Sequence, residues 1–159
     1  MTETLSYTYL KGYDIAWADV KGGFILVAET DDALLGILKE DLATTDYAVL
    51  LVKDGKEAIF YLERLDSQID LAIIDLDLPL VSGLDVIWSL VRKQKPKHTQ
   101  IIATSAVHVP LLKTVVRRLG VDAVIQIPIP AESWHKLIAA FLCGELSRYS
   151  QAMDSGTVD

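Results

Sequence analysis

Residues 72–86 read AIIDLDLPLVSGLDV, a pattern that predicts a strand, a loop and the start of a helix in direct succession. The apolar residues at 71–74 predict a buried strand that ends at Asp75. The loop that follows contains Pro79 and Gly83, two residue types that favour turns. Beyond the loop, apolar residues recur at 84, 87, 90 and 91, which is the spacing of one helix face.

Four other segments of the chain show the same order of a short apolar run and a helical stripe. The expected strands are 24–28, 47–52, 100–103 and 123–127, and the expected helices lie within 32–42, 58–65, 111–119 and 134–142. Each strand is a continuous apolar run and does not alternate with polar residues, which indicates burial on both faces. The chain is therefore expected to be an α/β protein with a doubly wound, five-stranded parallel sheet and helices on both faces.

The 159 residues fit one domain with three parts. Residues 1–22 form an N-terminal extension, in which Tyr13, Ile15 and Trp17 could add a short strand or pack on the body. Residues 23–148 form the domain itself. Residues 149–159 are polar, and we expect them to be a disordered tail.

Charge and composition narrow the class of protein. The formal net charge is −7 and no cluster of Lys and Arg offsets it, which disfavours binding to nucleic acid. No apolar stretch is long enough to span a membrane, and the first residues lack the basic and apolar regions of a signal peptide. We expect a soluble, cytoplasmic protein that does not act on membranes.

Polar side chains follow three of the expected strands. Glu29 comes after the first strand, Asp75 ends the third, and Ser105 comes after the fourth. In a doubly wound sheet the carboxyl ends of the strands line the ligand crevice, so these three side chains should converge there. Clustered oxygens suit a hard cation such as Mg²⁺, which could neutralise a phosphoryl group being transferred to a carboxylate.

The spacing of Asp75, Pro79 and Gly83 resembles the phosphorylation segment of response-regulator receiver domains in two-component signalling. Three further segments resemble the same family: ILVAETDDALL at its first strand, KDGKEAI before its second helix, and LGVDAVIQIPI at its fifth strand. The resemblance covers about residues 23–142. It implies the flavodoxin-like receiver fold, with strand order 2-1-3-4-5.

Site residues carry over from this resemblance one by one. Asp75 matches the phosphoacceptor, and the family's Mg²⁺ would be bound by Glu29, Asp75 and the main-chain carbonyl of Asp77. Ser105 matches the hydroxyl that contacts the phosphoryl group.

Three positions depart from the family pattern. Thr30 stands where an aspartate usually binds the metal, which predicts weakened binding of Mg²⁺. Ile127 stands where a lysine usually pairs with the phosphoryl oxygens, just before a proline whose peptide bond we expect to be cis. Val124 replaces an aromatic residue that takes part in switching.

Four residues outside this set are expected to have structural roles only. Asp31 and Asp32 are expected to cap the first helix, because acids favour helix N-termini. Trp88 and Trp134 are expected to be packing residues.

The resemblance implies a single-domain response regulator that receives phosphoryl groups on Asp75 from a histidine kinase or phosphotransfer protein. Output would then pass to a downstream target protein, and a homodimer could form through the fourth helix, fifth strand and fifth helix. The alternative is a pseudo-receiver, an interaction module that works independently of phosphorylation, which Thr30, Val124 and Ile127 favour. IIDLD also resembles the DxD motif of haloacid-dehalogenase-type phosphatases. That family's downstream lysine and acidic pair have no match in this sequence, so we do not expect an enzyme.

Overall fold

The computed structural model describes residues 23–43, 45–65, 68–93, 99–107 and 110–154. The N-terminal extension expected at 1–22 lies outside these residues. In the described part, no helix combines the length and the apolar character needed to cross a membrane.

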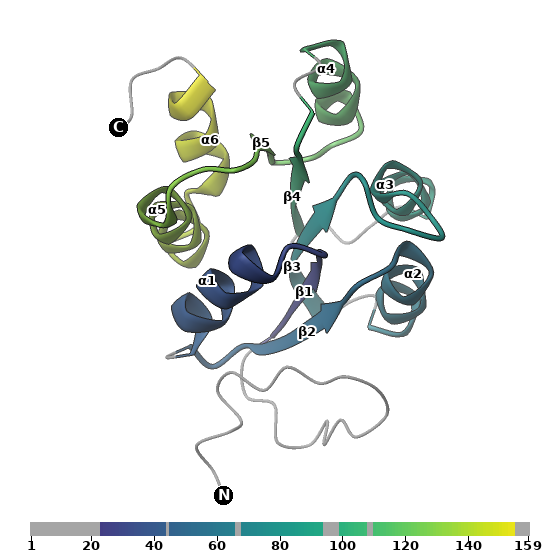
Figure 1. Cartoon of the computed structure of the whole chain (residues 1–159), viewed down its shortest axis with the longest axis horizontal. Coiled ribbons are helices and arrows are strands. Elements are labelled where there is room, and N and C mark those ends of the chain that lie inside the picture. The colour runs from purple at the N-terminus through teal and green to yellow at the C-terminus, as the bar shows by residue number, and fades with distance from the viewer. Residues whose placement is uncertain (1–22, 44, 66–67, 94–98, 108–109, 155–159) are drawn as a thin grey trace, which may run out of the picture.

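A five-stranded parallel sheet forms the centre of the molecule (Figure 1), with the order β2-β1-β3-β4-β5. The expected sheet and its strand order are therefore confirmed. The strands are β1 (Phe24–Ala28), β2 (Ala48–Val52), β3 (Ile69–Asp75), β4 (Gln100–Ser105) and β5 (Ala123–Gln126).

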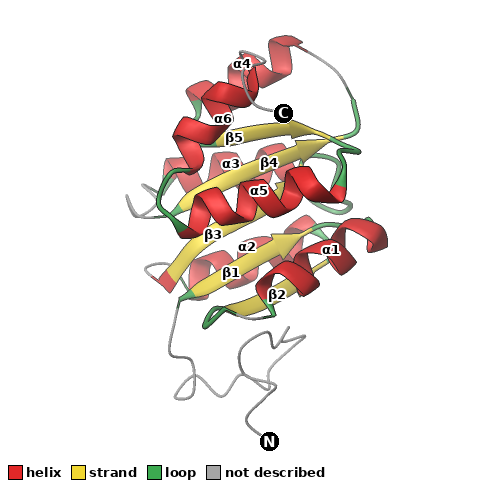
Figure 2. Cartoon of the chain, turned by 90° about the vertical axis from the view of Figure 1, so that its left-hand side faces the viewer, coloured by secondary structure: helices red, strands yellow, loops and turns green. Residues whose placement is uncertain are grey.

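Helices cover both faces of this sheet, as expected. In Figure 1, α1, α5 and α6 lie on one side of the strands, and α2, α3 and α4 lie on the other. Figure 2 shows α1 and α5 lying across the first of these faces. The helices are α1 (Asp32–Leu42), α2 (Gly55–Arg64), α3 (Gly83–Arg92), α4 (Pro110–Arg118), α5 (Ala131–Leu142) and α6 (Leu146–Asp154).

The core consists of two layers, one on each face of the sheet. Leu26 and Ile74 belong to the layer under α2 and α3, whereas Val27 and Ile73 belong to the layer under α1 and α5. Neighbouring residues of one strand point to opposite faces, so a fully apolar strand supplies both layers. Trp134 of α5 is 1% exposed and packs in the second layer, whereas Trp88 of α3 is 50% exposed. The packing interpretation is thus confirmed for Trp134 and wrong for Trp88.

The expectation of a disordered tail from residue 149 is wrong for 149–154, which belong to α6. The segment is polar overall, but one face of α6 carries a stripe of residues that packs on the core. Burial of that face stabilises the helix. Residues 155–159 lie outside the described part of the chain. The stripe has buried Leu146 and Ser150, with Tyr149 and Met153 packed against the layer under α1 and α5.

The loop between β3 and α3 is held close against the end of β3. The N–H of Gly83 donates to the carbonyl of Leu76 at 3.1 Å, and the N–H of Gly55 donates to the carbonyl of Pro79 at 3.1 Å. A Cβ atom at position 83 would lie 2.0 Å from the carbonyl oxygen of Asp75. Only glycine allows the start of α3 to approach the strand this closely.

Candidate functional site

Three polar side chains lie level with one another at the carboxyl edge of the sheet. Asp75 of β3 pairs with Thr104 of β4, and Glu29 follows directly after the pair formed by Ala28 and Ile74. Residues paired across parallel strands point to the same face of the sheet. Glu29, Asp75 and Thr104 therefore form a row across three strands, with Asp75 in the middle.

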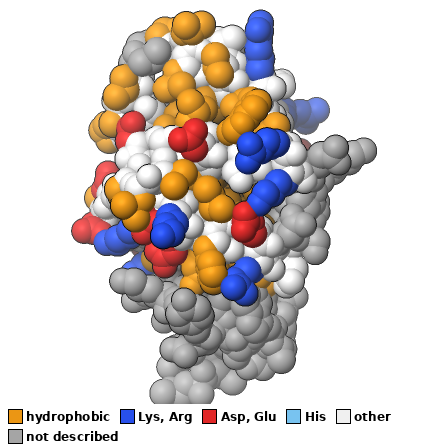
Figure 3. All heavy atoms as spheres, turned by 90° about the vertical axis from the view of Figure 1, so that its right-hand side faces the viewer, with side chains coloured by type: hydrophobic (Ala, Val, Ile, Leu, Met, Phe, Trp, Pro, Cys, Tyr) orange, Lys and Arg blue, Asp and Glu red, His pale blue; other side chains and the backbone are white. Residues whose placement is uncertain are grey.

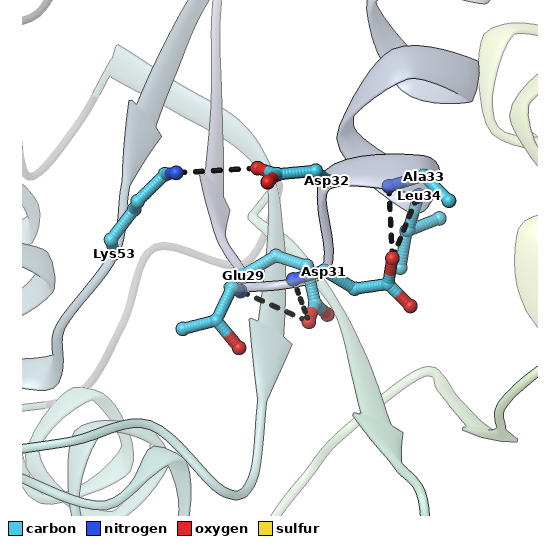
Figure 4. A network of polar contacts seen from close by, with 7 residues as sticks. Glu29, Asp31, Asp32, Ala33, Leu34 and Lys53 are labelled. Carbon is cyan, nitrogen blue, oxygen red and sulfur yellow. Dashed lines mark hydrogen bonds and ion pairs between the residues drawn. The ribbon is translucent and has the colours of Figure 1, made fainter.

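Glu29 is 1% exposed, and both of its carboxylate oxygens accept hydrogen bonds. Oε1 accepts from the N–H groups of Thr30 at 3.1 Å and Asp31 at 3.3 Å, as Figure 4 shows. Oε2 accepts from the hydroxyl of Thr104 at 3.0 Å. The strand-end turn and the distant strand β4 thus hold the same carboxylate.

Burial first, and then the neighbouring Asp75 carboxylate, raise the pKa of Glu29 to about 7. The hydrogen bond from Thr104 acts in the opposite direction and lowers this pKa. A raised pKa of this kind means that negative charge at the site is not fully compensated. A divalent cation would supply that compensation, and carboxylate oxygens are suitable ligands for it.

The raised pKa of Glu29 predicts that the protein loses stability as the pH rises. The folded state holds the Glu29 proton up to about pH 7, whereas a free glutamate releases it near 4.5. The folded state therefore binds more protons between these values, and the free energy of unfolding falls through that window. We expect this one group to contribute a fall of about 2 kcal/mol after allowing for screening at the sheet edge.

Urea denaturation of wild type and Glu29→Gln at pH 4 and pH 8, without divalent cations, measures this effect. The Glu29→Gln variant should lose less stability between the two pH values than wild type does. Glu40→Gln, which removes an exposed acid from α1, should behave as wild type. Equal pH dependence in all three proteins would contradict the assignment to Glu29.

Asp75 is buried, with 6% of its surface exposed, at the end of the central strand β3. Its Oδ1 accepts a hydrogen bond from the N–H of Asp77 at 2.9 Å, which folds the loop back over the carboxylate. The side chain of Asp77 is exposed. In the described residues, no three side chains of His, Cys, Asp or Glu lie together as a metal site. Glu29 and Asp75 are nevertheless two buried, neighbouring carboxylates, and carboxylate oxygens are ligands that suit a divalent cation.

Ser105 lies one residue beyond Thr104 and so points to the opposite face of the sheet from Asp75. Its hydroxyl donates to the carbonyl of Val107 at 3.2 Å and accepts from the N–H of Val107 at 3.1 Å. Ser105 also lines a cavity of about 100 Å³, together with Val124 of β5 and Lys113 of α4. The sequence predicted that Ser105 would converge with Glu29 and Asp75. In the structure, the residue of β4 that points to their face of the sheet is Thr104.

The three altered positions lie on different parts of the fold. Thr30 is exposed beside Glu29, and Val124 is partly buried against the layer under α2 and α3. Ile127 packs against the other core layer, and its N–H donates to the carbonyl of Ser105 at 2.9 Å. The Ile127–Pro128 peptide bond is cis, as expected. An apolar side chain thus stands at the end of β5, next to β4.

The start of α1 places two more acids at the same end of the sheet, and one of them pairs with a lysine (Figure 4). Asp31 caps the helix, with Oδ1 accepting from Ala33 at 2.9 Å and from Leu34 at 3.3 Å, which confirms one of the two expected caps. Asp32 pairs with Lys53, which follows β2, at 3.3 Å. The sequence did not indicate Lys53, because nothing in a single lysine after a strand shows which way its side chain points.

A family model described as the response regulator receiver domain matches residues 25–139. The uncharacterized transcriptional regulatory protein YrkP of Bacillus subtilis is 31% identical over 126 residues, which cover 79% of this chain and 50% of that protein. The chain therefore spans about half the length of this relative.

Solved structures of similar proteins have the same fold. The phosphorylated cyanobacterial phytochrome response regulator RcpA has a TM-score of 0.63 and 24% identity, with 76% of this chain and 93% of that chain covered. The receiver domain of sensor histidine kinase PA1611 from Pseudomonas aeruginosa, with magnesium in its active-site cleft, has a TM-score of 0.61 and 21% identity. That match covers 76% of this chain and 97% of the other.

Proposed function

This chain belongs to the response regulator receiver family, and we propose that it acts in two-component phosphorelay signalling with Asp75 as its phosphoacceptor. The observation that carries the proposal is the position of the Asp75 carboxylate. It lies at the carboxyl end of the central strand, beside Glu29, and the loop that follows it is held by the N-termini of α2 and α3. Ligand sites of doubly wound sheets lie at this edge.

The donor in such a relay is a phosphohistidine on a histidine kinase or phosphotransfer protein. An oxygen of the Asp75 carboxylate attacks the phosphorus, so that an O–P bond forms as the P–N bond breaks. The electron pair of the broken bond stays on the imidazole nitrogen, which then takes up a proton. The product is an acyl phosphate on Asp75, and the chain works as a signalling module and not as an enzyme with its own substrate.

Glu29, Asp75 and the main-chain carbonyl of Asp77 are the groups that would hold Mg²⁺. When bound, the cation would neutralise charge on the phosphoryl group. Two acidic side chains leave this site with less negative charge than three would, because Thr30 is neutral. We therefore propose that Mg²⁺ binds weakly, as the neutral Thr30 after the first strand predicts.

Output is proposed to pass through contacts made by α4, β5 and α5, with a downstream target protein or a second copy of the chain. On α4, Leu111 is 73% exposed and Val115 is 44% exposed. Figure 3 shows hydrophobic side chains and cationic side chains mixed on the side of the molecule that α2, α3 and α4 form. Exposed apolar side chains beside charged ones are typical of protein interaction surfaces. Ser105 lines the cavity beneath α4 and is proposed to connect this face to the phosphoryl group.

Incubation with Mg²⁺ and a small phosphodonor tests the proposed function. Intact mass should show one added phosphoryl group on wild type and none on Asp75→Ala. Asp77→Asn is the matched control, because it neutralises an exposed acid of the same loop and keeps the main-chain carbonyl. If wild type gains no phosphoryl group even at high Mg²⁺, the phosphorelay proposal fails and the pseudo-receiver alternative stands.

A further inference from the structure

Thr104 is fully buried in β4, and its hydroxyl reaches across the end of β3 to Glu29, which follows β1. The hydroxyl donates to Oε2 of Glu29 at 3.0 Å. This hydrogen bond joins residues 75 positions apart in the chain. It is thus a direct link between the first and fourth strands at the level of Asp75.

The hydrogen bonds of Glu29 leave little freedom for its carboxylate. A carboxylate has about four lone-pair positions, and here three donors occupy them: two main-chain N–H groups on Oε1 and the Thr104 hydroxyl on Oε2. The remaining position is on Oε2, the same oxygen that Thr104 holds, and the neighbouring Asp75 carboxylate raises the pKa of Glu29. Thr104 therefore fixes the orientation of Glu29 toward Asp75.

We propose that Thr104 is a positioning residue for a divalent cation at the Glu29 and Asp75 carboxylates. The inference rests on the cation site of the proposed function and assigns to it a residue that does not touch the cation. Hydrogen bonds that orient a metal ligand typically contribute 10- to 100-fold in metal affinity. With a neutral Thr30 and only two acidic side chains, the orientation of each carboxylate matters more than in a site with three.

The same hydrogen bond connects the cation site to the strand that carries Ser105. Thr104 and Ser105 are neighbours in β4, with side chains on opposite faces of the sheet. A shift of Glu29 on binding a cation would therefore act on β4 directly, beside the hydroxyl that lines the cavity under α4.

Thr104→Val tests the proposal, because valine keeps the shape of threonine and removes the hydroxyl. Isothermal titration with Mg²⁺ and with Mn²⁺ should show a dissociation constant about tenfold higher than that of wild type. The Mg²⁺ concentration that gives half the maximal phosphorylation rate should rise by the same factor, with the maximal rate unchanged. Thr104→Ser, which restores the hydroxyl, should return both quantities to the wild-type values.

Thr99→Val is the matched control. Thr99 is also buried, directly before β4, and its hydroxyl donates to the carbonyl of Ile69 at 2.7 Å. Each valine variant loses one buried side-chain hydrogen bond, at a cost of about 1 kcal/mol in stability. Thr99 lies at the opposite end of the strand from Asp75, so Thr99→Val should bind both cations as wild type does.

The outcomes separate this inference from the proposed function. If Thr104→Val binds cations as tightly as wild type, the role of Thr104 is wrong and the cation site stands. If Thr99→Val weakens binding as much as Thr104→Val, the effect belongs to general stability of the sheet, which also overturns the role. If wild type binds neither cation, the cation site itself fails and the role of Thr104 fails with it.

Discussion

Replacing Thr30 by Asp and Ile127 by Lys together is expected to tighten the binding of beryllofluoride, in the presence of Mg²⁺, by about 10- to 100-fold. Beryllofluoride on an aspartate stands in for a phosphoryl group. Thr30 is exposed beside Glu29, so an aspartate there adds a carboxylate for the cation. A lysine at 127 would bring an ammonium group to the end of β5, and each hydrogen bond to a charged group contributes about 1.5–3 kcal/mol.

Titration followed by Trp fluorescence, with each single variant alongside the double variant, measures this effect. The aliphatic stem of a lysine can cover the apolar surface that Ile127 now packs against, and this limits the loss of stability. The control adds the same charges elsewhere, as Thr114→Asp with Gln151→Lys, at two exposed positions on α4 and α6. Equal affinities in the wild type and the double variant would show that these two positions do not limit the site.

Gly83→Ala is expected to lower the free energy of unfolding by about 3 kcal/mol. The added Cβ would lie 2.0 Å from the carbonyl oxygen of Asp75 and 2.7 Å from Cα of Leu76, which are both main-chain atoms. No rotation of a side chain can relieve such a contact, so the loop from 75 to 83 must move. Because this loop carries the proposed phosphoacceptor, we also expect a loss of phosphorylation.

Gly36→Ala is the matched control for this substitution. Gly36 lies exposed within α1, and apart from its chain neighbours and the backbone of its own helix no atom lies within 4 Å of the position that its Cβ would take. Alanine favours helices over glycine, so the stability should rise by about 0.5–1 kcal/mol. Urea denaturation of both variants measures the contrast, and a Gly83→Ala protein as stable as wild type would contradict the account of the loop.

Local pattern alone was enough to predict each strand and five of the helices. A run such as Phe24–Ala28 is apolar throughout because both of its faces are covered, and this shows directly in the sequence. The cap at Asp31 is equally local, because its side chain bonds to residues two and three positions later. Helix α6 was missed because its apolar face is short, and its burial depends on packing against distant residues.

The sequence by itself determined the order of strands and helices, the apolar layers and the place of Asp75 at a strand end. Only the tertiary structure decided which residues are level with Asp75 across the sheet. A shift of one residue along a strand turns a side chain to the other face, so strand register decides that Thr104 and not Ser105 reaches Glu29. Register depends on packing between strands far apart in the chain, and no pattern within a single strand encodes it.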